Sequence, residues 1–191
     1  MTTRSRLIEV ATVGAFLSVI GFHYAAFSDR TYSAGFDGLI FSAIIEGSEP
    51  DWNKNLFHAH HFLFNPIGIG FHRALRFSGA HADGGHAVEL MNALLGVAAL
   101  GVLYVGLRRA GTGSFASLSA IFFLGASYAF WRRASESQVY MLSVFLITAF
   151  HVAVLEHLSR PRAISYGLVI AAWLFSVLCH QTNILLASAV C

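Results

Sequence analysis

Residues 87–107 read AVELMNALLGVAALGVLYVGL, and this stretch decides the fold class. It contains a single charged side chain, Glu89, close to its beginning. A helix needs about 20 mostly apolar residues to cross the hydrocarbon core of a bilayer, and this stretch meets that requirement. The sequence therefore predicts a transmembrane helix here and an all-α fold for the chain.

Composition also indicates a membrane protein. Hydrophobic residues make up 56% of the 191 residues and charged residues only 12%, against about 25% charged residues in soluble domains. The net charge is +2, and no basic tract of the kind that binds nucleic acid occurs. We expect residues 1–191 to form one membrane domain, a polytopic bundle of about five transmembrane helices. The expected spans are residues 7–27, 87–107, 114–131, 138–157 and 163–182.

The first apolar stretch has a second interpretation. Arg4 and Arg6 precede it, and a positive start followed by an apolar run is also the pattern of a cleaved signal peptide. Glu9 and His23 interrupt the run. We favour a membrane span.

Orientation follows from the basic residues, which concentrate in short loops on the cytoplasmic side. Three very short segments hold Arg4 and Arg6, Arg108 and Arg109, and Arg160 and Arg162. An equal number of basic residues is spread more thinly over the other side: Arg30, Lys54, Arg73, Arg76, Arg132 and Arg133. We therefore expect a multi-pass protein of the cell membrane with a cytoplasmic N-terminus, in which residues 28–86 form a long outer loop.

The outer loop is predicted to carry two short interfacial helices. Residues 36–47 read as a helix with Asp37 as its N-cap and Gly47 as its stop. A second helix is expected to begin at Asn65, with Pro66 in its first turn. Its apolar face would comprise Ile67, Phe71 and Leu75. A small soluble subdomain packed on the bundle is the alternative.

Polar side chains gather at the outer ends of the expected spans. Such groups are costly inside a bilayer, so they tend to face the bundle interior or a cavity. We expect one shared site at the outer face, although polar helix ends alone would give the same pattern. The set comprises Asp37, His58, His60, His61, Glu89, Asn92, Glu136, Tyr140, His180, Gln181 and Asn183.

The histidine cluster also permits a metal interpretation. His58, His60 and His61 are close in sequence, and Asp51 lies nearby. Zinc sites need three or four ligands with supporting hydrogen bonds, whereas interfacial histidines also bind phosphate or lipid headgroups. We therefore expect no resident cofactor, with a divalent metal at the three histidines as the alternative.

Short motifs are distributed over nearly the whole chain. They are Phe36-Asp37-Gly38, His60-His61-Phe62-Leu63-Phe64-Asn65-Pro66, Asn92-Ala93-Leu94-Leu95-Gly96, Ser127-Tyr128-Ala129-Phe130-Trp131, Ser135-Glu136-Ser137-Gln138-Val139-Tyr140 and His180-Gln181-Thr182-Asn183. With a first span, a long outer loop and then closely spaced spans, the pattern resembles the GT-C superfamily of membrane glycosyltransferases. It is most similar to the protein O-mannosyltransferase-like branch and related bacterial membrane families.

The resemblance implies transfer of a sugar from a polyprenyl-phosphate donor to an acceptor on the outer face. Asp37 matches the loop aspartate that serves as general base in the family. A second acidic residue often follows that aspartate, but here Gly38 follows, and Glu136 is the next acidic residue on the same face. Residues expected to bind substrate are His60, His61, Arg132, Arg133, Tyr140, His180, Gln181 and Asn183.

The sequence departs from GT-C enzymes in length, because those enzymes usually have more spans. It ends at Cys191 inside an apolar run, and we interpret it as the N-terminal part of a longer protein, a truncated inactive fragment, or a half that needs a C-terminal partner. Membrane lipids are the other expected partner. The alternative function is a non-enzymatic transporter or lipid-binding protein. A transporter would place polar residues near the bilayer midplane, on broken helices.

Overall fold

The computed structural model describes residues 3–28, 36–48 and 55–189. Within these ranges the chain is all-helical and forms no β-strand. Arg30, Asp51, Lys54 and Cys191 lie outside the described residues. The helices are α1 (Thr3–Ala26), α2 (Phe36–Glu46), α3 (Phe64–Phe77), α4 (Gly84–Arg109), α5 (Ser114–Gly125), α6 (Tyr128–Ser135), α7 (Tyr140–Ser159), α8 (Ala163–Cys179) and the 3₁₀ helix η1 (Gln181–Ala189).

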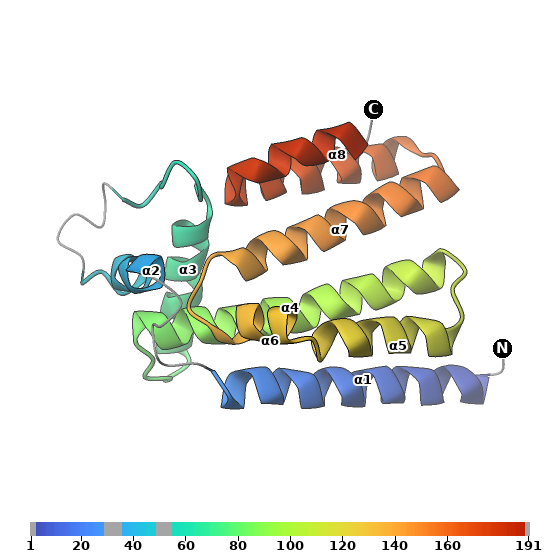
Figure 1. The fold of residues 1–191 in the computed structure, drawn as a ribbon, viewed down its shortest axis with the longest axis horizontal. Helices are drawn as coiled ribbons and strands as arrows, with labels where there is room; N and C mark the ends of the chain where they lie inside the picture. The colour runs from blue at the N-terminus through green and yellow to red at the C-terminus, as the bar shows by residue number, and fades with distance from the viewer. Residues whose placement is uncertain (1–2, 29–35, 49–54, 190–191) are drawn as a thin grey trace.

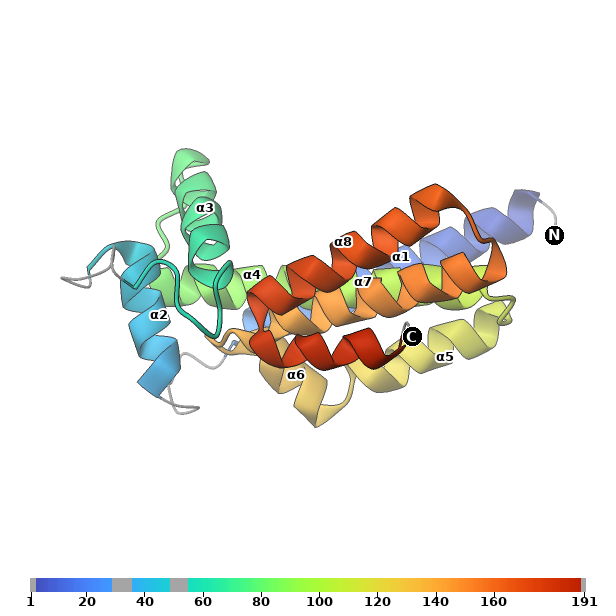
Figure 2. The ribbon, with the colours of Figure 1, turned by 90° about the horizontal axis from the view of Figure 1, so that it is seen from above.

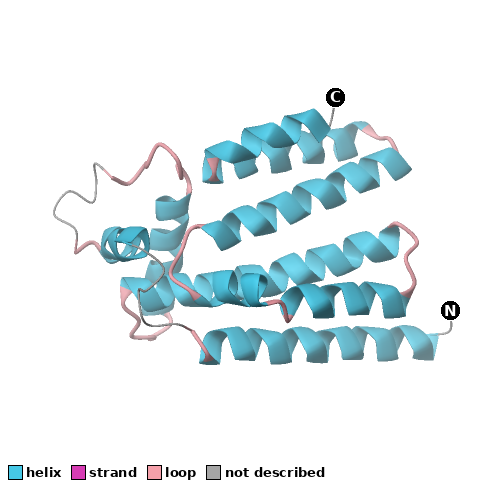
Figure 3. Cartoon of the chain, in the orientation of Figure 1, coloured by secondary structure: helices cyan, strands magenta, loops and turns pink. Residues whose placement is uncertain are grey.

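The long helices α1, α4, α5, α7 and α8 run along the long axis of the molecule and are joined by loops (Figures 1 and 3). Helices α2 and α3 instead lie across one end of this bundle, as the second view shows (Figure 2). Helix α4 is central, since it contacts α1, α2, α3, α5, α6 and α7. The N-terminus lies at the end opposite to α2 and α3 (Figure 1).

Three of the described helices are long and apolar enough to cross a membrane, namely Ser5–Ala26, Gly84–Arg109 and Tyr140–Ser159. They correspond to the spans expected at residues 7–27, 87–107 and 138–157, and their length and apolar composition indicate a membrane protein. The other two expected spans are not single helices of full membrane-spanning length. Residues 114–131 fall in α5 and α6, which are bent by 64° relative to each other, and α8 is apolar but shorter than a span.

The break between α5 and α6 has a local cause. Ser127 begins a new helix, because its hydroxyl accepts a hydrogen bond from the Phe130 N–H at 3.4 Å. The break leaves the carbonyl of Gly125 without a helical partner, and the Tyr24 hydroxyl of α1 donates to it at 2.6 Å. The bend is therefore stabilised by a helix that precedes it by about a hundred residues in the chain.

The charge inside the first span is also paired. Glu9 of α1 accepts hydrogen bonds from the Tyr104 hydroxyl at 2.5 Å and from Arg108 Nε at 2.7 Å. Both partners belong to the last turns of α4, at the end of the bundle where the N-terminus lies. Pairing of this kind reduces the cost of a carboxylate in an apolar helix.

The transverse helices are packed on the bundle rather than separate from it. A hydrophobic cluster joins Phe41 and Ile44 of α2, Phe64 of α3, Val88 of α4 and Leu142 of α7. All five side chains are buried. The position of α2 relative to α4 and α7 is therefore determined by close packing.

Two details of the predicted short helices are wrong and one is confirmed. Helix α2 begins at Phe36, so Asp37 lies within the first turn, where a carboxylate favours the helix dipole, instead of at the N-cap. Helix α3 begins at Phe64, and Asn65 is buried inside it, donating to the Asn55 carbonyl at 3.0 Å. Gly47 does end α2, with a positive φ of 81°.

The face of α3 that packs against the rest of the protein is not the predicted apolar face. Phe64, Asn65, Gly68 and His72 are buried, whereas Ile67 is exposed. The reason lies at Gly68, where a side chain would overlap Ile45 of α2. Close approach of the two helices therefore turns the glycine face of α3 toward α2.

Candidate functional site

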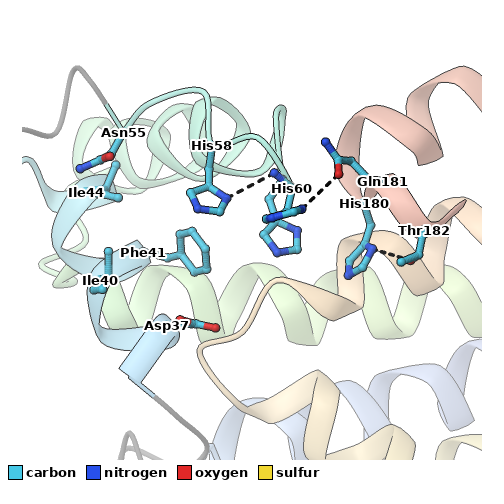
Figure 4. Close-up of a pocket in the computed structure, with 11 residues that line it drawn as sticks. Asp37, Ile40, Phe41, Ile44, Asn55, His58, His60, His180, Gln181 and Thr182 are labelled. Atoms are coloured by element: carbon cyan, nitrogen blue, oxygen red, sulfur yellow. Dashed lines mark hydrogen bonds between the residues drawn. The ribbon is translucent and has the colours of Figure 1, made fainter. Parts of the chain in front are cut away.

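A pocket of about 730 Å³ opens at the end of the bundle where α2 and α3 lie. Its lining comes from α2, from the segment that precedes α3, and from the junction of α8 with η1 (Figure 4). The lining residues are Asp37, Ile40, Phe41, Ile44, Asn55, His58, His60, His61, His180, Gln181 and Thr182. Of the ten predicted catalytic and substrate-binding residues, the pocket brings together Asp37, His60, His61, His180 and Gln181.

The segment 58–63, which we call the histidine loop, is fastened to the end of α8. Helix α8 ends at Cys179 because His180 adopts an extended backbone, and the last turn of a helix leaves carbonyl oxygens without helical partners. The Leu63 N–H donates to Leu178 O at 3.1 Å, and His61 Nδ1 donates to Cys179 O at 3.3 Å. The free carbonyls of α8 thus hold one wall of the pocket.

The imidazole rings of the histidine loop lie close to one another and to His180. The ring centroids of His58 and His61 are 5.8 Å apart, and those of His61 and His180 are 4.8 Å apart. Burial lowers the pKa of His61, and the neighbouring imidazoles lower it further, although its bond to Cys179 O acts in the opposite direction. Burial and the nearby His60 lower the pKa of His180. His61 and His180 therefore favour the neutral state.

Asp37 stands at the edge of the pocket, on the first turn of α2 and across from Gln181 and Thr182 (Figure 4). Its position is set by the next residue, Gly38, because a Cβ at Gly38 would overlap the Ser137 carbonyl. Ser42 on the following turn forms a 2.8 Å hydrogen bond with the Ser137 hydroxyl. In this packing no second acidic side chain fits directly after Asp37.

The segment that supports α2, residues 136–139 between α6 and α7, is itself held by Asn92. The fully buried Asn92 amide donates to Glu136 O at 2.8 Å and to Gln138 O at 2.7 Å. Asn92, expected to share the outer site, is thus a supporting residue beneath the pocket.

Glu136, the second predicted catalytic residue, is not among the lining residues of the pocket. Its buried carboxylate accepts hydrogen bonds from Arg132 Nε at 3.3 Å and from Arg133. The Arg132 side chain is 41% exposed and the Arg133 side chain is 43% exposed. Arg133 lies 4.6 Å from the centre of the Tyr140 ring, and that ring is 6.1 Å from His180. Tyr140 therefore connects Arg133 to the wall of the pocket. Arg132 instead donates to the Tyr128 hydroxyl at 3.2 Å, and Tyr128 lines a different pocket.

Asn183 is also removed from the pocket. It is buried and donates to the Ser143 hydroxyl at 2.8 Å and to Ser176 O at 2.9 Å, so it joins η1 to α7 and α8. The sequence reading missed Thr182, which lines the pocket and forms a 2.7 Å hydrogen bond with His180 Nδ1. Thr182 lies within the polar run of residues 180–183, and this feature of the sequence could have identified it as a pocket residue.

Among the described residues, no group of three or more His, Cys, Asp or Glu side chains is arranged to hold a metal ion. His58 has a specific obstacle, since its Nδ1 accepts the His60 backbone N–H at 3.4 Å. Its neutral ring then carries the proton on Nε2, so neither nitrogen is free to ligate. The geometry gives the three-histidine metal alternative no support.

Comparison with known proteins identifies no relative: no protein family, no curated protein and no solved structure matches the chain.

Proposed function

We propose that the protein is a multi-pass membrane glycosyltransferase of the GT-C type, or the N-terminal part of one. It transfers a sugar from a polyprenyl-phosphate donor to an acceptor at the outer membrane face. In this proposal α5 and α6 form one bent span and α8 is a short span, so the bundle crosses the membrane about five times.

The proposed orientation is supported by the arrangement of arginines. Arg108, Arg109, Arg160 and Arg162 belong to turns at the end of the bundle where the N-terminus lies (Figure 1). Clustered arginine in short turns is typical of the cytoplasmic side. The pocket then faces the outer side, with α2 and α3 lying along the membrane surface.

The observation that carries the proposed function is the content of the pocket. A single open cavity at one end of an apolar bundle contains the carboxylate-bearing Asp37 and several polar side chains on the facing wall. Arg133 is connected to the wall of this cavity through Tyr140, and Arg132 shares the Glu136 carboxylate with Arg133; more than a third of each arginine side chain is exposed. A base, a polar cavity and adjacent cations are the groups that sugar transfer from a lipid phosphate requires.

In the proposed reaction Asp37 accepts the proton of an acceptor hydroxyl while the hydroxyl oxygen attacks the anomeric carbon of the sugar. The bond from that carbon to the phosphate oxygen breaks, and the bonding electrons leave with the polyprenyl phosphate. The arginines stabilise the departing phosphate, since guanidinium groups bind phosphate oxygens in pairs. One displacement of this kind inverts the anomeric configuration.

The test is sugar transfer from labelled polyprenyl-phosphate sugars by the reconstituted protein. Asp37→Asn should lower the rate by about 10²–10⁴-fold, the usual contribution of a general base. The matched control is Asp83→Asn, because Asp83 caps α4 by accepting the His86 N–H at 2.7 Å and asparagine caps equally well. Undiminished transfer by Asp37→Asn would exclude Asp37 as the base.

A second candidate function, lipid binding or transport, is favoured by the bent pair α5 and α6. Broken helices occur in transporters. Beside the bend lies a pocket of about 540 Å³ lined mainly by apolar and aromatic side chains. Its lining residues are Val19, Ile20, His23, Gly125, Ala126, Tyr128 and Trp131. Transport of a labelled lipid by Asp37→Asn at the wild-type rate, with no sugar transfer by either protein, would favour this function.

A further inference from the structure

The protonation of the histidine loop follows from its hydrogen-bond partners, beginning with His60. Gln181 donates from Nε2 to the Ala59 carbonyl at 2.5 Å, and a carbonyl can only accept. The orientation of the Gln181 amide is thereby fixed, and its Oε1 faces His60 Nδ1 at 3.1 Å. Because Oε1 also can only accept, neutral His60 must carry its proton on Nδ1.

The same reasoning applies to His61 and gives the opposite result for His58. His61 Nδ1 faces Cys179 O, an acceptor, so it carries the proton. His58 Nδ1 accepts the backbone N–H of His60, so the proton of the neutral His58 ring is on Nε2. Neither His60 Nε2 nor His61 Nε2 has a hydrogen-bond partner among the described residues.

The histidine loop therefore presents a defined pattern to the pocket in its neutral state. His60 and His61 offer two acceptors, their Nε2 lone pairs, and His58 offers one donor, its Nε2–H. Hydroxyl groups donate and accept at once, so a pair of neighbouring hydroxyls on a sugar ring matches this pattern. A phosphate monoester or diester at neutral pH offers acceptor oxygens only and does not match the two lone pairs.

We propose that the histidine loop binds the hydroxyl groups of a neutral sugar, with His60 and His61 as acceptors and His58 as donor. This assignment rests on the proposed function, because it names the part of the substrate that the loop would hold. It differs from the expectation that His60 and His61 meet the donor phosphate. That role passes to Arg132 and Arg133, which are charged at all physiological pH values.

Protonation of the loop would reverse the preference, and several groups bear on it. The rings of His58, His60 and His180 lie around His61, and Asp37 lines the same pocket. Burial and the other imidazoles lower the pKa of His61, which opposes a cationic loop. Phosphate binding that depends on His60 and His61, as distinct from the arginines, should accordingly be absent at pH 7.5 and appear only in acid.

Nuclear magnetic resonance tests the protonation pattern directly. Two-bond ¹H–¹⁵N correlations of the imidazole rings, recorded on the protein in nanodiscs at pH 7.5, distinguish a proton on Nδ1 from one on Nε2. We expect Nδ1–H for His60 and His61 and Nε2–H for His58. An Nε2–H form of His60 or His61 would overturn the proposal.

Binding of methyl glycosides tests the ligand class. Asparagine reproduces the Nδ1 position of histidine and glutamine the Nε2 position. His60→Asn should therefore keep the Gln181 contact but weaken glycoside binding about tenfold, the effect of losing one hydrogen bond. His60→Gln should stay within about threefold of wild type. Equal glycoside binding by the two variants would refute the proposal. Binding of phosphate but not of glycosides by the wild-type protein at pH 7.5 would also refute it.

The two proposals fail separately. Glycoside binding is measured without donor lipid, so its outcome does not depend on sugar transfer. Binding without sugar transfer would remove the proposed enzyme and keep the sugar site. Sugar transfer with an unchanged KM in His60→Asn would keep the enzyme and remove the inferred role of the loop.

Discussion

His60 and Gln181 are 121 positions apart in the chain, yet His60 Nδ1 and Gln181 Oε1 face each other at 3.1 Å. The backbone N–H of Gln181 also donates to His60 O at 3.4 Å. The start of η1 therefore holds the histidine loop through its side chain and its backbone. This junction forms the wall of the pocket that faces Asp37 (Figure 4).

Removal of the Gln181 amide should loosen the histidine loop. Gln181→Leu loses the bonds to His60 and Ala59, and we expect faster hydrogen exchange in residues 58–63 with little change elsewhere. The control is Ser188→Ala, because Ser188 in the same 3₁₀ helix only bonds locally to Leu185 O. Exchange rates in the loop that match those of wild type would show that Gln181 does not hold it.

Substitution of Gly38 should displace α2. Gly38→Ala places a methyl group against the Ser137 carbonyl, and we expect a loss of about 1–3 kcal/mol in the free energy of unfolding. Gly70→Ala in α3 is the matched control, since nothing lies within 4 Å of its added Cβ. That change should instead stabilise the protein by about 0.5–1 kcal/mol through helix propensity. Denaturation in detergent measures both, and equal effects would contradict the close approach.

Loss of the Asn92 amide should destabilise the segment between α6 and α7. Asn92→Leu leaves the carbonyls of Glu136 and Gln138 buried without their donor, at a cost of about 2–4 kcal/mol. Thr12→Val is the control, because Thr12 bonds only to Ile8 O within α1. A melting temperature for Asn92→Leu as high as that of the control would exclude the supporting role.

The ion pairs of Glu136 should respond non-additively. Arg132→Gln and Arg133→Gln each leave one arginine beside the buried carboxylate, so each should lower the melting temperature slightly. The double variant leaves that carboxylate unpaired, and its effect should exceed the sum of the two. Simple additivity in this cycle would mean that Glu136 does not depend on the arginines.

Stability should fall in mild acid because of His61 and His180. Both pKa values lie below the ordinary 6.5 in the folded protein, so the unfolded chain binds more protons as the pH drops below that value. The stabilisation is complete above about pH 6.5 and is lost progressively below it. Melting curves from about pH 7.5 to 5.5 measure the slope.

His61→Gln should reduce the dependence of the melting temperature on pH. His81→Gln, at an exposed loop position, should leave that dependence unchanged. A melting temperature that rises toward acid would contradict the sign. An unchanged slope in His61→Gln would assign the pH dependence to other groups.

Local features of the fold were predictable from the sequence. The apolar runs at residues 7–27, 87–107 and 138–157 predicted three long helices, because apolar length is written in consecutive residues. Gly47 predicted the end of α2, since a positive φ is a property of the residue itself. The break after Gly125 escaped prediction, because Ser127 differs little in the sequence from a serine inside a span.

Side-chain roles were less predictable than helices. Asn92, Asn183 and Glu136 are polar residues near helix ends, as Asp37 and His180 are, and the sequence grouped them together. In the structure the first two bond to backbone carbonyls and Ser143, and Glu136 pairs with arginines. A buried polar group takes whichever partner packing brings within reach, and that partner can be distant in the chain.

The sequence by itself therefore predicted an all-helical fold with three helices long and apolar enough to cross a membrane, and with polar residues concentrated at helix ends. Only the tertiary structure decided which of them meet in one pocket and which protons the histidines carry. Helix formation depends on neighbours along the chain, whereas the state of His60 depends on Gln181 and the state of His61 on Cys179 O. Those contacts exist only once α8 has packed beside the histidine loop.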